Sequence, residues 1–569
     1  MNELKTYQQW LSMIPQDTIL HKELISIKGN EPEIQDRFYR DLEFGTGGLR
    51  GILGAGTNRM NIYTVSKATQ GLADYLNSIS EAPSVCIAYD TRNMSKEFAA
   101  AAAEVFCANG VKTCLFEDVR PTPMLSYAVR HKGADAGIVI TASHNPKEYN
   151  GYKVYDLDGG QITDAMAAEI LDKINAVDVF KGVKRVLPGD TEFLSLMGEE
   201  VDAAYYEQVK SLVLRPELLK KKSATLKILY SPLHGSGNVP VRRVLKELGF
   251  SQTDIVPEQE KPDGNFPTAP YPNPEEPSVF ALAKKLAEKT TPDLIFATDP
   301  DCDRIGVLVK DDTGDFSILT GNQVGVLLCD YILSAKKEKG ILPKNAAVIK
   351  TIVTTHMAAP VCKAYGAELV DTLTGFKYIG EKIGQWEQSG QYSFQFGFEE
   401  SYGYLAGEFT RDKDAVIAAV LIAEMTLWHK ENGRTLYDAL EELFKRYGYF
   451  EEKLLSFHMP GVDGQEKIAS IIAGLRKDYS QYILHDSIAF IEDYKLSLRR
   501  DCPTGIETEI EFPKSNVLKF VFKDDFWMVL RPSGTEPKMK AYIGASGLEK
   551  RIAQKRLDAL EATIAKILC

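Results

Sequence analysis

The stretch Gly137–Lys153, GIVITASHNPKEYNGYK, joins an apolar, β-branched run to a short polar loop. The run GIVI predicts a strand, because Ile and Val favour strands and glycine marks the boundary. The loop TASHNP (141–146) contains small polar residues and a proline, which favour a tight turn. Catalytic groups of open α/β sheets commonly lie just past the end of such a strand. Ser143 is therefore a candidate catalytic residue, although a turn with only local hydrogen bonds fits the same residues.

The pattern that leads to this stretch occurs three times along the chain. In each unit a strand runs through a loop into a helix, a glycine ends the helix, and a second strand follows. These segments span residues 84–116, 226–249 and 347–370, with capping glycines Gly110, Gly249 and Gly366. Each segment has the order expected of a right-handed crossover. The repeat therefore predicts three related mixed α/β domains.

After each crossover a further strand runs into an unusual polar loop. The three loops are TASHNP (141–146), DPDCDR (299–304) and GFEESYG (397–403). The spacing from capping glycine to loop is the same in the first and third units, whereas a proline-rich insert at 257–277 lengthens the second. Because the loops occupy equivalent positions, we expect them to face one central cleft.

The C-terminal region has a different pattern. Strand-like segments at 453–457, 516–522 and 527–530 flank helical segments at 465–478 and 548–568, which indicates an α+β domain. The predicted fold class is α/β. Three related mixed α/β domains, at 1–200, 201–315 and 316–450, precede a C-terminal α+β domain at 451–569, all around one central cleft.

The composition, 44% apolar and 26% charged, is that of a soluble globular protein. A net charge of −12 argues against non-specific nucleic-acid binding. No run approaches the ~18 apolar residues of a membrane span, and the N-terminus lacks an apolar signal core. The eight cysteines show no zinc-ligand spacing, so reduced thiols in a cytoplasmic protein are expected.

The glycine-rich segment GTGGLRG (45–51) is too rich in glycine to be expected in a packed element. Its backbone N–H groups and Arg50 are suited to an anion. It matches neither a P-loop nor a clean G-x-G-x-x-G, so nucleotide binding gains no support. A flexible surface loop remains the alternative.

Asp299, Asp301 and Asp303 form a dense cluster of carboxylates. Unpaired carboxylates this close repel one another, so a cation is the natural partner. An EF-hand is excluded because its glycine and glutamate positions hold Arg304 and Lys310. A few hard oxygen ligands suit Mg²⁺ with an open coordination position. A solvated acidic turn is the alternative.

The segment RPSGT (531–535) offers a guanidinium, two hydroxyls and a glycine backbone, a combination suited to phosphate. An exposed arginine on a turn would look similar. Glu399 and Ser401, in the third loop, can bind sugar hydroxyls or cap a helix. His144, His234 and His356 are candidate general bases, but loop histidines are more often structural. Together these groups are best explained by phosphoryl transfer on a polyhydroxylated phosphate, with Ser143 as the nucleophile.

The four loops TASHNP, DPDCDR, EESYG and RPSGT, in this order, resemble the signature loops of the α-D-phosphohexomutase superfamily. GTGGLRG also resembles its N-terminal motif, so the resemblance covers nearly the whole chain. GTNRMN (56–61) and RDKD (411–414) are similar to the phosphoglucomutase branch, which includes phosphopentomutases and glucose-1,6-bisphosphate synthases.

The resemblance implies a phosphoserine at Ser143 whose phosphate completes an Mg²⁺ site with the three aspartates. Arg50, Lys153 and Arg304 would surround the transferring phosphoryl group. The sugar would be bound by Thr374, Glu399, Ser401 and Lys413, and its second phosphate by Arg531, Ser533, Gly534, Thr535 and Lys540. Lys377 is an additional candidate, either for binding the substrate or as an acid/base. Some relatives carry a histidine in the third loop where this chain has EESYG, so the general acid/base stays open.

The expected reaction is interconversion of glucose 1-phosphate and glucose 6-phosphate through a glucose 1,6-bisphosphate intermediate, which would also act as activator. Phosphomannomutase, phosphopentomutase and glucose-1,6-bisphosphate synthase activities are the nearest alternatives. A non-catalytic sugar-phosphate-binding protein and an Mg²⁺-dependent phosphatase are more distant ones. The expected partner is a small sugar phosphate, with no nucleic acid or membrane, and the expected assembly is a monomer or weak homodimer.

Overall fold

The computed structural model describes residues 2–45, 47–186, 191–459, 462–483, 487–532 and 538–568. The chain forms two compact units. The first contains Met1–Ala346 and Phe376–Thr435, and the second contains Ala347–Gly375 and Leu436–Cys569. The second unit therefore joins one short internal segment to the whole C-terminal part of the chain.

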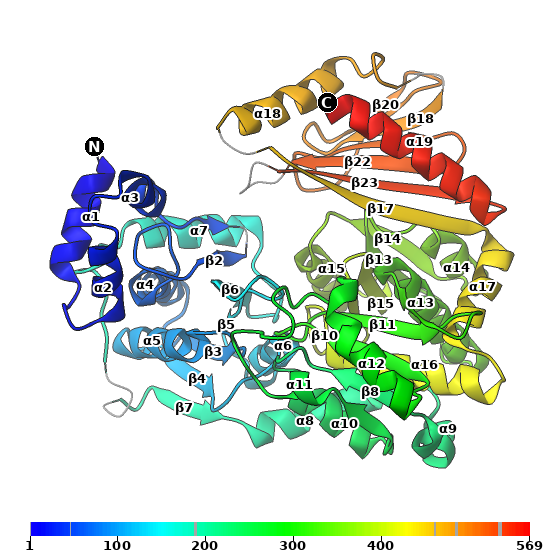
Figure 1. The fold of residues 1–569 in the computed structure, drawn as a ribbon, viewed down its shortest axis with the longest axis horizontal. Helices are drawn as coiled ribbons and strands as arrows, with labels where there is room; N and C mark the ends of the chain where they lie inside the picture. The colour runs from blue at the N-terminus through cyan, green and yellow to red at the C-terminus, as the bar shows by residue number, and fades with distance from the viewer. Residues whose placement is uncertain are drawn as a thin grey trace. The chain divides into compact units, whose positions relative to one another are not determined.

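The first unit begins with three helices. They are α1 (Asn2–Met13), α2 (Ile19–Ser26) and α3 (Glu31–Phe38), the dark blue group in Figure 1. Trp10 is buried among the rings of Phe38, Tyr63 and Phe180. Because Tyr63 lies on α4 (Ile62–Ile79), this aromatic cluster fastens the N-terminal helices to the α/β core that follows.

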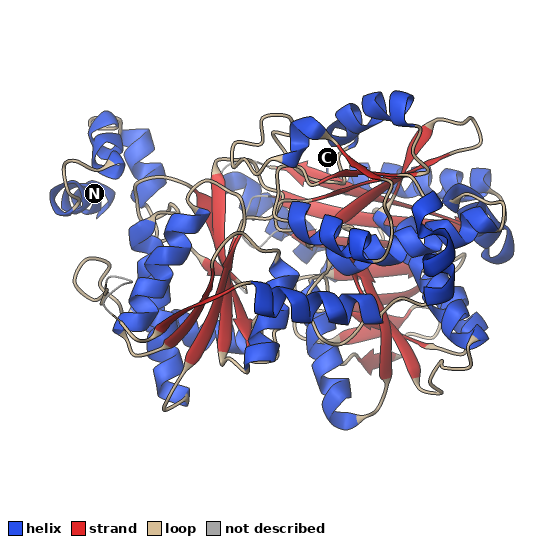
Figure 2. Cartoon of the chain, turned by 90° about the horizontal axis from the view of Figure 1, so that it is seen from below, coloured by secondary structure: helices blue, strands red, loops and turns tan. Residues whose placement is uncertain are grey.

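The first sheet has the strand order β1-β2-β6-β5-β3-β4-β7 among the described residues. Its strands are β1 (Phe44–Gly45), β2 (Gly48–Ile52), β3 (Ser84–Tyr89), β4 (Lys112–Phe116), β5 (Ala136–Ile140), β6 (Tyr149–Asp156) and β7 (Leu194–Met197). The helices that accompany them are α4, α5 (Ser95–Ala108), α6 (Thr122–Lys132) and α7 (Asp164–Asn175), and Figure 2 shows strands between helices here. Strand β3 pairs in parallel with both β4 and β5, which confirms the predicted crossover.

The glycine-rich segment is part of this sheet, so the expectation that it could not be a packed element is wrong. Gly45 ends β1 and Gly48–Gly51 lie on β2, which pairs antiparallel with β1 and with β6. Gly48 has φ +131°, and a Cβ there would lie 1.8 Å from the Tyr152 carbonyl oxygen. Glycine is thus required by close strand packing, which leaves Arg50 on an ordered strand.

The second sheet has the order β12-β11-β10-β8-β9. Its strands are β8 (Ile228–Ser231), β9 (Thr253–Ile255), β10 (Leu294–Thr298), β11 (Ile305–Lys310) and β12 (Phe316–Leu319). The helices in this part of the chain are α8 (Glu199–Ser211), α9 (Pro216–Lys222), α10 (Asn238–Glu247), α11 (Pro257–Glu260) and α12 (Ala281–Thr290), and α13 (Gly321–Glu338) follows β12. Because β10 is parallel to β8 and antiparallel to β11, the aspartate loop is the reversal between β10 and β11.

The first unit also contains α15 (Phe376–Ser389), β15 (Ser393–Glu399), β16 (Gly403–Leu405) and α16 (Ala415–Glu431). Strand β15 was expected to end at Phe396, but its antiparallel pairing with β16 extends to Glu399. Glu399 is therefore the last residue of a strand.

The second unit contains β13 (Ala346–Thr351), α14 (Ala358–Tyr365) and β14 (Glu368–Thr372), followed by α17 (Leu436–Tyr447). Strands β13 and β14 are parallel, as the third crossover requires. The C-terminal sheet has the order β17-β23-β22-β21-β18-β19-β20, and neighbouring strands pair antiparallel throughout its described residues. Its elements are β17 (Tyr449–His458), α18 (Val462–Lys477), β18 (Ile488–Asp493), β19 (Leu498–Asp501), β20 (Glu507–Glu509), β21 (Leu518–Phe522), β22 (Phe526–Pro532), β23 (Lys538–Gly547) and α19 (Lys550–Leu568).

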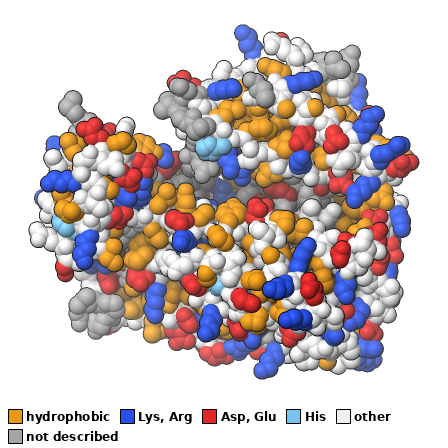
Figure 3. Space-filling model, viewed as in Figure 1, with side chains coloured by type: hydrophobic (Ala, Val, Ile, Leu, Met, Phe, Trp, Pro, Cys, Tyr) orange, Lys and Arg blue, Asp and Glu red, His pale blue; other side chains and the backbone are white. Residues whose placement is uncertain are grey.

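The predicted fold class is confirmed: mixed α/β sheets precede a C-terminal domain built on an antiparallel sheet. In the part of the chain that the structure describes, no helix is both long and apolar enough to cross a membrane. On the face drawn in Figure 3, acidic and basic side chains are interspersed and form no single extended basic area.

Candidate functional site

The loop after β5 holds Ser143 in an unusual backbone conformation. Ser143 has φ 52°, in the left-handed region that non-glycine residues rarely adopt, and its side chain is buried. Its N–H donates to Thr141 Oγ1 at 2.8 Å, and Thr141 Oγ1 donates to Asp90 Oδ2 at 2.6 Å. Cys302 and Tyr402, in the second and third loops, also have positive φ. The three loops that the sequence placed in equivalent positions thus share this local strain.

The carbonyl groups of the serine loop converge on Arg92, a residue that belongs to no recognised motif. The Arg92 guanidinium donates to the carbonyl oxygens of Ser143, Asn145, Pro146 and Tyr149. The ring centroid of Phe266, in the insert of the second domain, lies 5.0 Å from the guanidinium carbon of Arg92. Arg92 therefore holds the backbone of the loop through contacts that no local sequence pattern reveals.

Replacing Arg92 by lysine should lower kcat/KM about 10- to 100-fold, because one ammonium cannot satisfy several carbonyl groups in different directions. Steady-state kinetics and thermal unfolding would measure the effect, with Arg185→Lys at an exposed ion pair as the control. Unchanged kinetics in a folded Arg92→Lys protein would contradict the positioning role.

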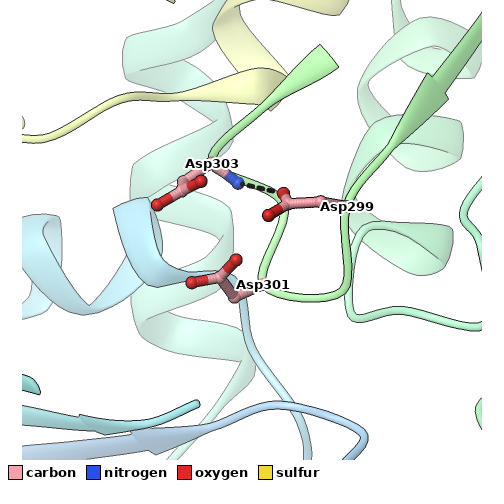
Figure 4. A group of neighbouring side chains, drawn as sticks. All are labelled: Asp299, Asp301 and Asp303. Atoms are coloured by element: carbon pink, nitrogen blue, oxygen red, sulfur yellow. Dashed lines mark hydrogen bonds between the residues drawn. The ribbon is translucent and has the colours of Figure 1, made fainter. Parts of the chain in front are cut away.

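The three aspartates of the second loop converge, as Figure 4 shows. Their carboxylate oxygens lie within 4.8 Å of one another, and all three residues are buried. Asp299 Oδ1 accepts the N–H groups of Asp303 and Arg304, both at 3.1 Å. Ser143 Oγ donates to Asp299 Oδ2 at 2.7 Å. The first and second loops therefore meet where the resemblance places the nucleophile and the metal.

Electrostatics at the cluster favour a bound cation. Burial, followed by the charges of Asp301 and Asp303, raises the pKa of Asp299 well above its usual value. Burial, the largest single cause, opposes ionisation of Asp301, but the Lys153 charge together with hydrogen bonds from Asp299, Lys153 and Thr122 lowers the pKa of that carboxyl. Asp301 Oδ1 and Asp303 Oδ1 are buried without a hydrogen-bond partner. Two unsatisfied anionic oxygens beside a third carboxylate fit a hard divalent cation.

Two lysines approach the same aspartates. Lys153 Nζ lies 2.8 Å from Asp301 Oδ2 and 3.3 Å from Asp303 Oδ2. Lys413 Nζ lies 3.2 Å from Asp303 Oδ2 and 3.0 Å from Asp412 Oδ1. Asp412 is fixed in turn by the Tyr155 hydroxyl at 2.8 Å. The site thus combines three carboxylates with two ammonium groups, which suits a metal ion together with a phosphoryl group.

Two further residues, Thr122 and Glu275, belong to no motif but contact the aspartate loop. The backbone N–H and the hydroxyl of Thr122, the first residue of α6, both donate to Asp301 at 2.9 Å. Arg304 pairs with Glu275 of the insert at 2.6 Å. Neither contact is local in sequence, so a pattern of neighbouring residues gives no signal for it.

The third loop is joined to the second through the backbone. Arg304 and Gly403 form an isolated antiparallel bridge, and the Ile305 N–H donates to the Tyr402 carbonyl at 3.1 Å. Glu399 is buried, and its charge contributes to raising the pKa of Lys413. Ser401 lies in the turn after Glu399 and is half-buried. Three of the four motif loops therefore meet within the first unit.

Arg50 and Lys377 lie near different parts of this unit. Arg50 Nη1 donates to Asn145 Oδ1 at 3.3 Å, which places it beside the serine loop. Lys377 Nζ pairs with Asp164 Oδ1 at 2.6 Å, at the start of α7. The pairing of Lys377 with the first domain is a contact that its sequence context did not indicate.

The histidines differ in their surroundings. His234 has both ring nitrogens within 3.0 Å of oxygen partners, the Lys261 carbonyl and the Thr268 hydroxyl, which fits a structural role. His144 Nδ1 lies 3.1 Å from Ser143 Oγ, and burial lowers the pKa of its ring. In the second unit, His356 stacks on Trp527, and burial lowers its pKa to about 4.

The remaining predicted residues belong to the second unit. Thr374 follows β14 and is half-buried. Arg531 on β22 pairs directly with Lys540 on β23, so their side chains lie on one face of the C-terminal sheet. Ser533, Gly534 and Thr535 lie outside the described residues.

Three family models match the chain in order. They are the α/β/α domains I, II and III of phosphoglucomutase/phosphomannomutase, at residues 41–179, 203–314 and 320–447. The N-terminal helices α1–α3 precede the first match.

Similar proteins cover almost the whole chain. A phosphoglucomutase of Staphylococcus saprophyticus is 37% identical over 90% of this chain and 92% of its own. A phosphoglucomutase of Staphylococcus epidermidis is 36% identical over 97% of this chain and 99% of its own. Among solved structures, a putative phosphomannomutase of Thermus thermophilus (TM-score 0.66, 21% identity, 92% and 99% coverage) and the Paramecium phosphoglucomutase parafusin (TM-score 0.68, 17% identity, 93% and 95% coverage) share the fold. The chain therefore belongs to the phosphoglucomutase/phosphomannomutase family of the α-D-phosphohexomutase superfamily and is an isomerase that transfers a phosphoryl group within its substrate.

Proposed function

We propose that the chain interconverts glucose 1-phosphate and glucose 6-phosphate by phosphoryl transfer through Ser143. The observation that carries this proposal is the 2.7 Å contact between Ser143 Oγ and Asp299, inside a cluster of three buried aspartates. Relatives that are 36% and 37% identical over most of the chain are named phosphoglucomutase, which supports glucose phosphates as substrates.

In the proposed reaction, Ser143 carries a phosphoryl group and donates it to a hydroxyl of the bound sugar phosphate. The Ser143 Oγ–P bond breaks as a bond from the sugar oxygen to phosphorus forms, and the hydroxyl proton passes to a base. The resulting glucose 1,6-bisphosphate reorients so that its two phosphates exchange places. Its other phosphate is then transferred to Ser143. Lys153, Arg50 and Arg304 balance the charge of the phosphoryl group.

The proposed metal is Mg²⁺, held by Asp299, Asp301, Asp303 and an oxygen on Ser143. When bound, Mg²⁺ neutralises charge on the phosphoryl group. Glu399, Ser401, Lys413, Lys377 and Thr374 are proposed to bind the sugar. Arg531, Ser533, Gly534, Thr535 and Lys540 are proposed to bind the second phosphate.

We further propose that glucose 1,6-bisphosphate activates the enzyme by phosphorylating Ser143. The proposed setting is the cytoplasm, with no nucleic-acid or membrane partner, as a monomer or weak homodimer. The net charge of −12 supports the exclusion of nucleic acid.

A coupled assay with glucose, mannose and ribose 1-phosphates tests the substrate. The glucose compound should give the highest kcat/KM in the presence of Mg²⁺ and trace glucose 1,6-bisphosphate. Inert glucose phosphates beside an active ribose phosphate would assign a phosphopentomutase instead. Net formation of glucose 1,6-bisphosphate from another phosphoryl donor, without isomerisation, would assign a bisphosphate synthase.

A further inference from the structure

Two cysteines lie side by side in the first sheet, away from the aspartate cluster. Cys86 on β3 and Cys114 on β4 are direct partners in the parallel register. The same rung continues to Gly137 on β5 and to Ser195 on β7. Directly paired residues project from the same face of a sheet, so the two thiols stand next to each other.

The rung runs from the protein interior to solvent. Cys86 is fully buried, Cys114 is half-buried, and Ser195 at the edge strand is exposed. Among the other described cysteines, each is buried, so Cys114 alone in that set has partial access to solvent. A small oxidant can therefore reach Cys114 past the edge strand, while Cys86 is buried beside it.

The surroundings of Cys114 favour its thiolate. Ser195 Oγ donates to Cys114 Sγ at 3.3 Å. A hydrogen bond from the Cys86 thiol contributes most to lowering the pKa of Cys114 to about 6, burial opposes the effect, and Ser195 and Lys132 support it. The thiolate is the reactive form of cysteine, and an accessible thiolate beside a second thiol is the arrangement of a redox-sensitive pair.

We propose that Cys114 and Cys86 form a reversible disulfide when the protein meets hydrogen peroxide, and that this bond lowers catalytic activity. The Cys114 thiolate attacks one peroxide oxygen, the O–O bond breaks, and the leaving hydroxide takes a proton to become water. The Cys86 thiol then attacks the Cys114 sulfenic sulfur, the S–S bond forms as the S–O bond breaks, and a second water leaves. Two thiols lose two electrons, and the peroxide gains them.

The spacing of the strands allows this bond but requires a local adjustment. Neighbouring strands lie about 4.8 Å apart, within the range of Cα separations that disulfides span, whereas bonded cysteines bring their Cβ atoms to about 3.8 Å. Closing the rung must therefore draw β3 and β4 together or twist them.

Two routes connect this rung to the catalytic loops. Strand β3 ends at Tyr89, directly before Asp90, whose carboxylate holds the Thr141 hydroxyl of the serine loop. On the rung itself, a Cβ at Gly137 would meet Val129 and Leu125 of α6, so that helix packs on this face. The first residue of α6, Thr122, donates to Asp301. A shift of the rung is thus transmitted to both the serine loop and the aspartate loop.

The test treats the reduced full-length protein with hydrogen peroxide, blocks free thiols with N-ethylmaleimide and maps peptides by mass spectrometry. We expect a peptide pair linked through Cys86 and Cys114, a loss of activity of about tenfold or more, and recovery with dithiothreitol. Cys114→Ser should prevent both the link and the loss. Cys86→Ala should leave a sulfenic acid at Cys114 that dimedone traps.

Cys107→Ala, at a buried cysteine on α5 outside the pair, is the control and should respond as the wild type does. Absence of the linked peptide, or a linked peptide with unchanged activity, would overturn the proposal. The activity readout rests on the proposed function. Mass spectrometry detects the linked peptide whatever substrate the enzyme uses. A wrong substrate assignment would therefore be distinguishable from failure of the disulfide to form.

Discussion

Replacing Ser143 by alanine is expected to lower kcat at least about a thousandfold, because the variant lacks the oxygen that receives the phosphoryl group. The fold should persist, since Arg92 binds the Ser143 carbonyl oxygen, which alanine retains. Alanine also meets the same left-handed backbone constraint as serine. The coupled mutase assay measures the loss.

Intact mass provides the second readout of this variant. The wild-type protein incubated with glucose 1,6-bisphosphate should carry one added phosphate, and the Ser143→Ala protein should carry none. Ser211→Ala, at an exposed serine, is the matched control and should behave as the wild type does. Full turnover by a folded Ser143→Ala protein would instead favour direct attack by water, as in a phosphatase.

Replacing Asp301 by asparagine is expected to lower kcat at least about a hundredfold, because the site loses one of three anionic metal ligands. The exchange also removes the carboxylate partner of Lys153, which lies 2.8 Å away. When activity is measured against Mg²⁺ concentration, the variant should bind the metal more weakly and need a higher concentration for half-maximal activity. Asp312→Asn, at an exposed aspartate in the loop after β11, is the matched control.

Metal binding should also appear in thermal unfolding, independently of activity. The pKa of Asp299 is raised in the folded protein, so ionising this group costs stability as pH rises above its unfolded value of about 4. A divalent cation offsets that cost, so Mg²⁺ should raise Tm more at about pH 8 than at about pH 5. EDTA should reverse the shift, and Asp301→Asn should nearly abolish it. An Mg²⁺ effect of equal size in wild type and variant would place the metal elsewhere.

The fold could be predicted from the sequence largely because its information is local. Glycines such as Gly110 and Gly366 have positive φ and end helices. Strands such as β3 and β5 are largely apolar runs. The glycine-rich hairpin was misjudged for the opposite reason. Gly48 is required by the carbonyl of Tyr152, a residue of β6 distant in sequence.

The same distinction separates the site residues that were predicted from those that were missed. Ser143 and the three aspartates stand in dense local motifs, and the structure brings them together. Arg92, Thr122 and Glu275 act on residues far away in the chain, so their roles appear only once the sheets are folded. Lys377 was predicted as a substrate-site candidate, and nothing in the sequence indicated its ion pair with Asp164.

The insert at 257–277 has a consequence for how this family can exchange parts. It supplies Phe266 beneath Arg92 of the first domain and Glu275 beside Arg304 of the second, and its Gly264 carbonyl accepts from Asn93 at 3.3 Å. A chimaera that takes its second domain from a relative with a shorter connection would keep every motif loop yet leave the serine loop without part of its support. Recombination between relatives should therefore succeed only when the insert and the Arg92–Asn93 segment are inherited together.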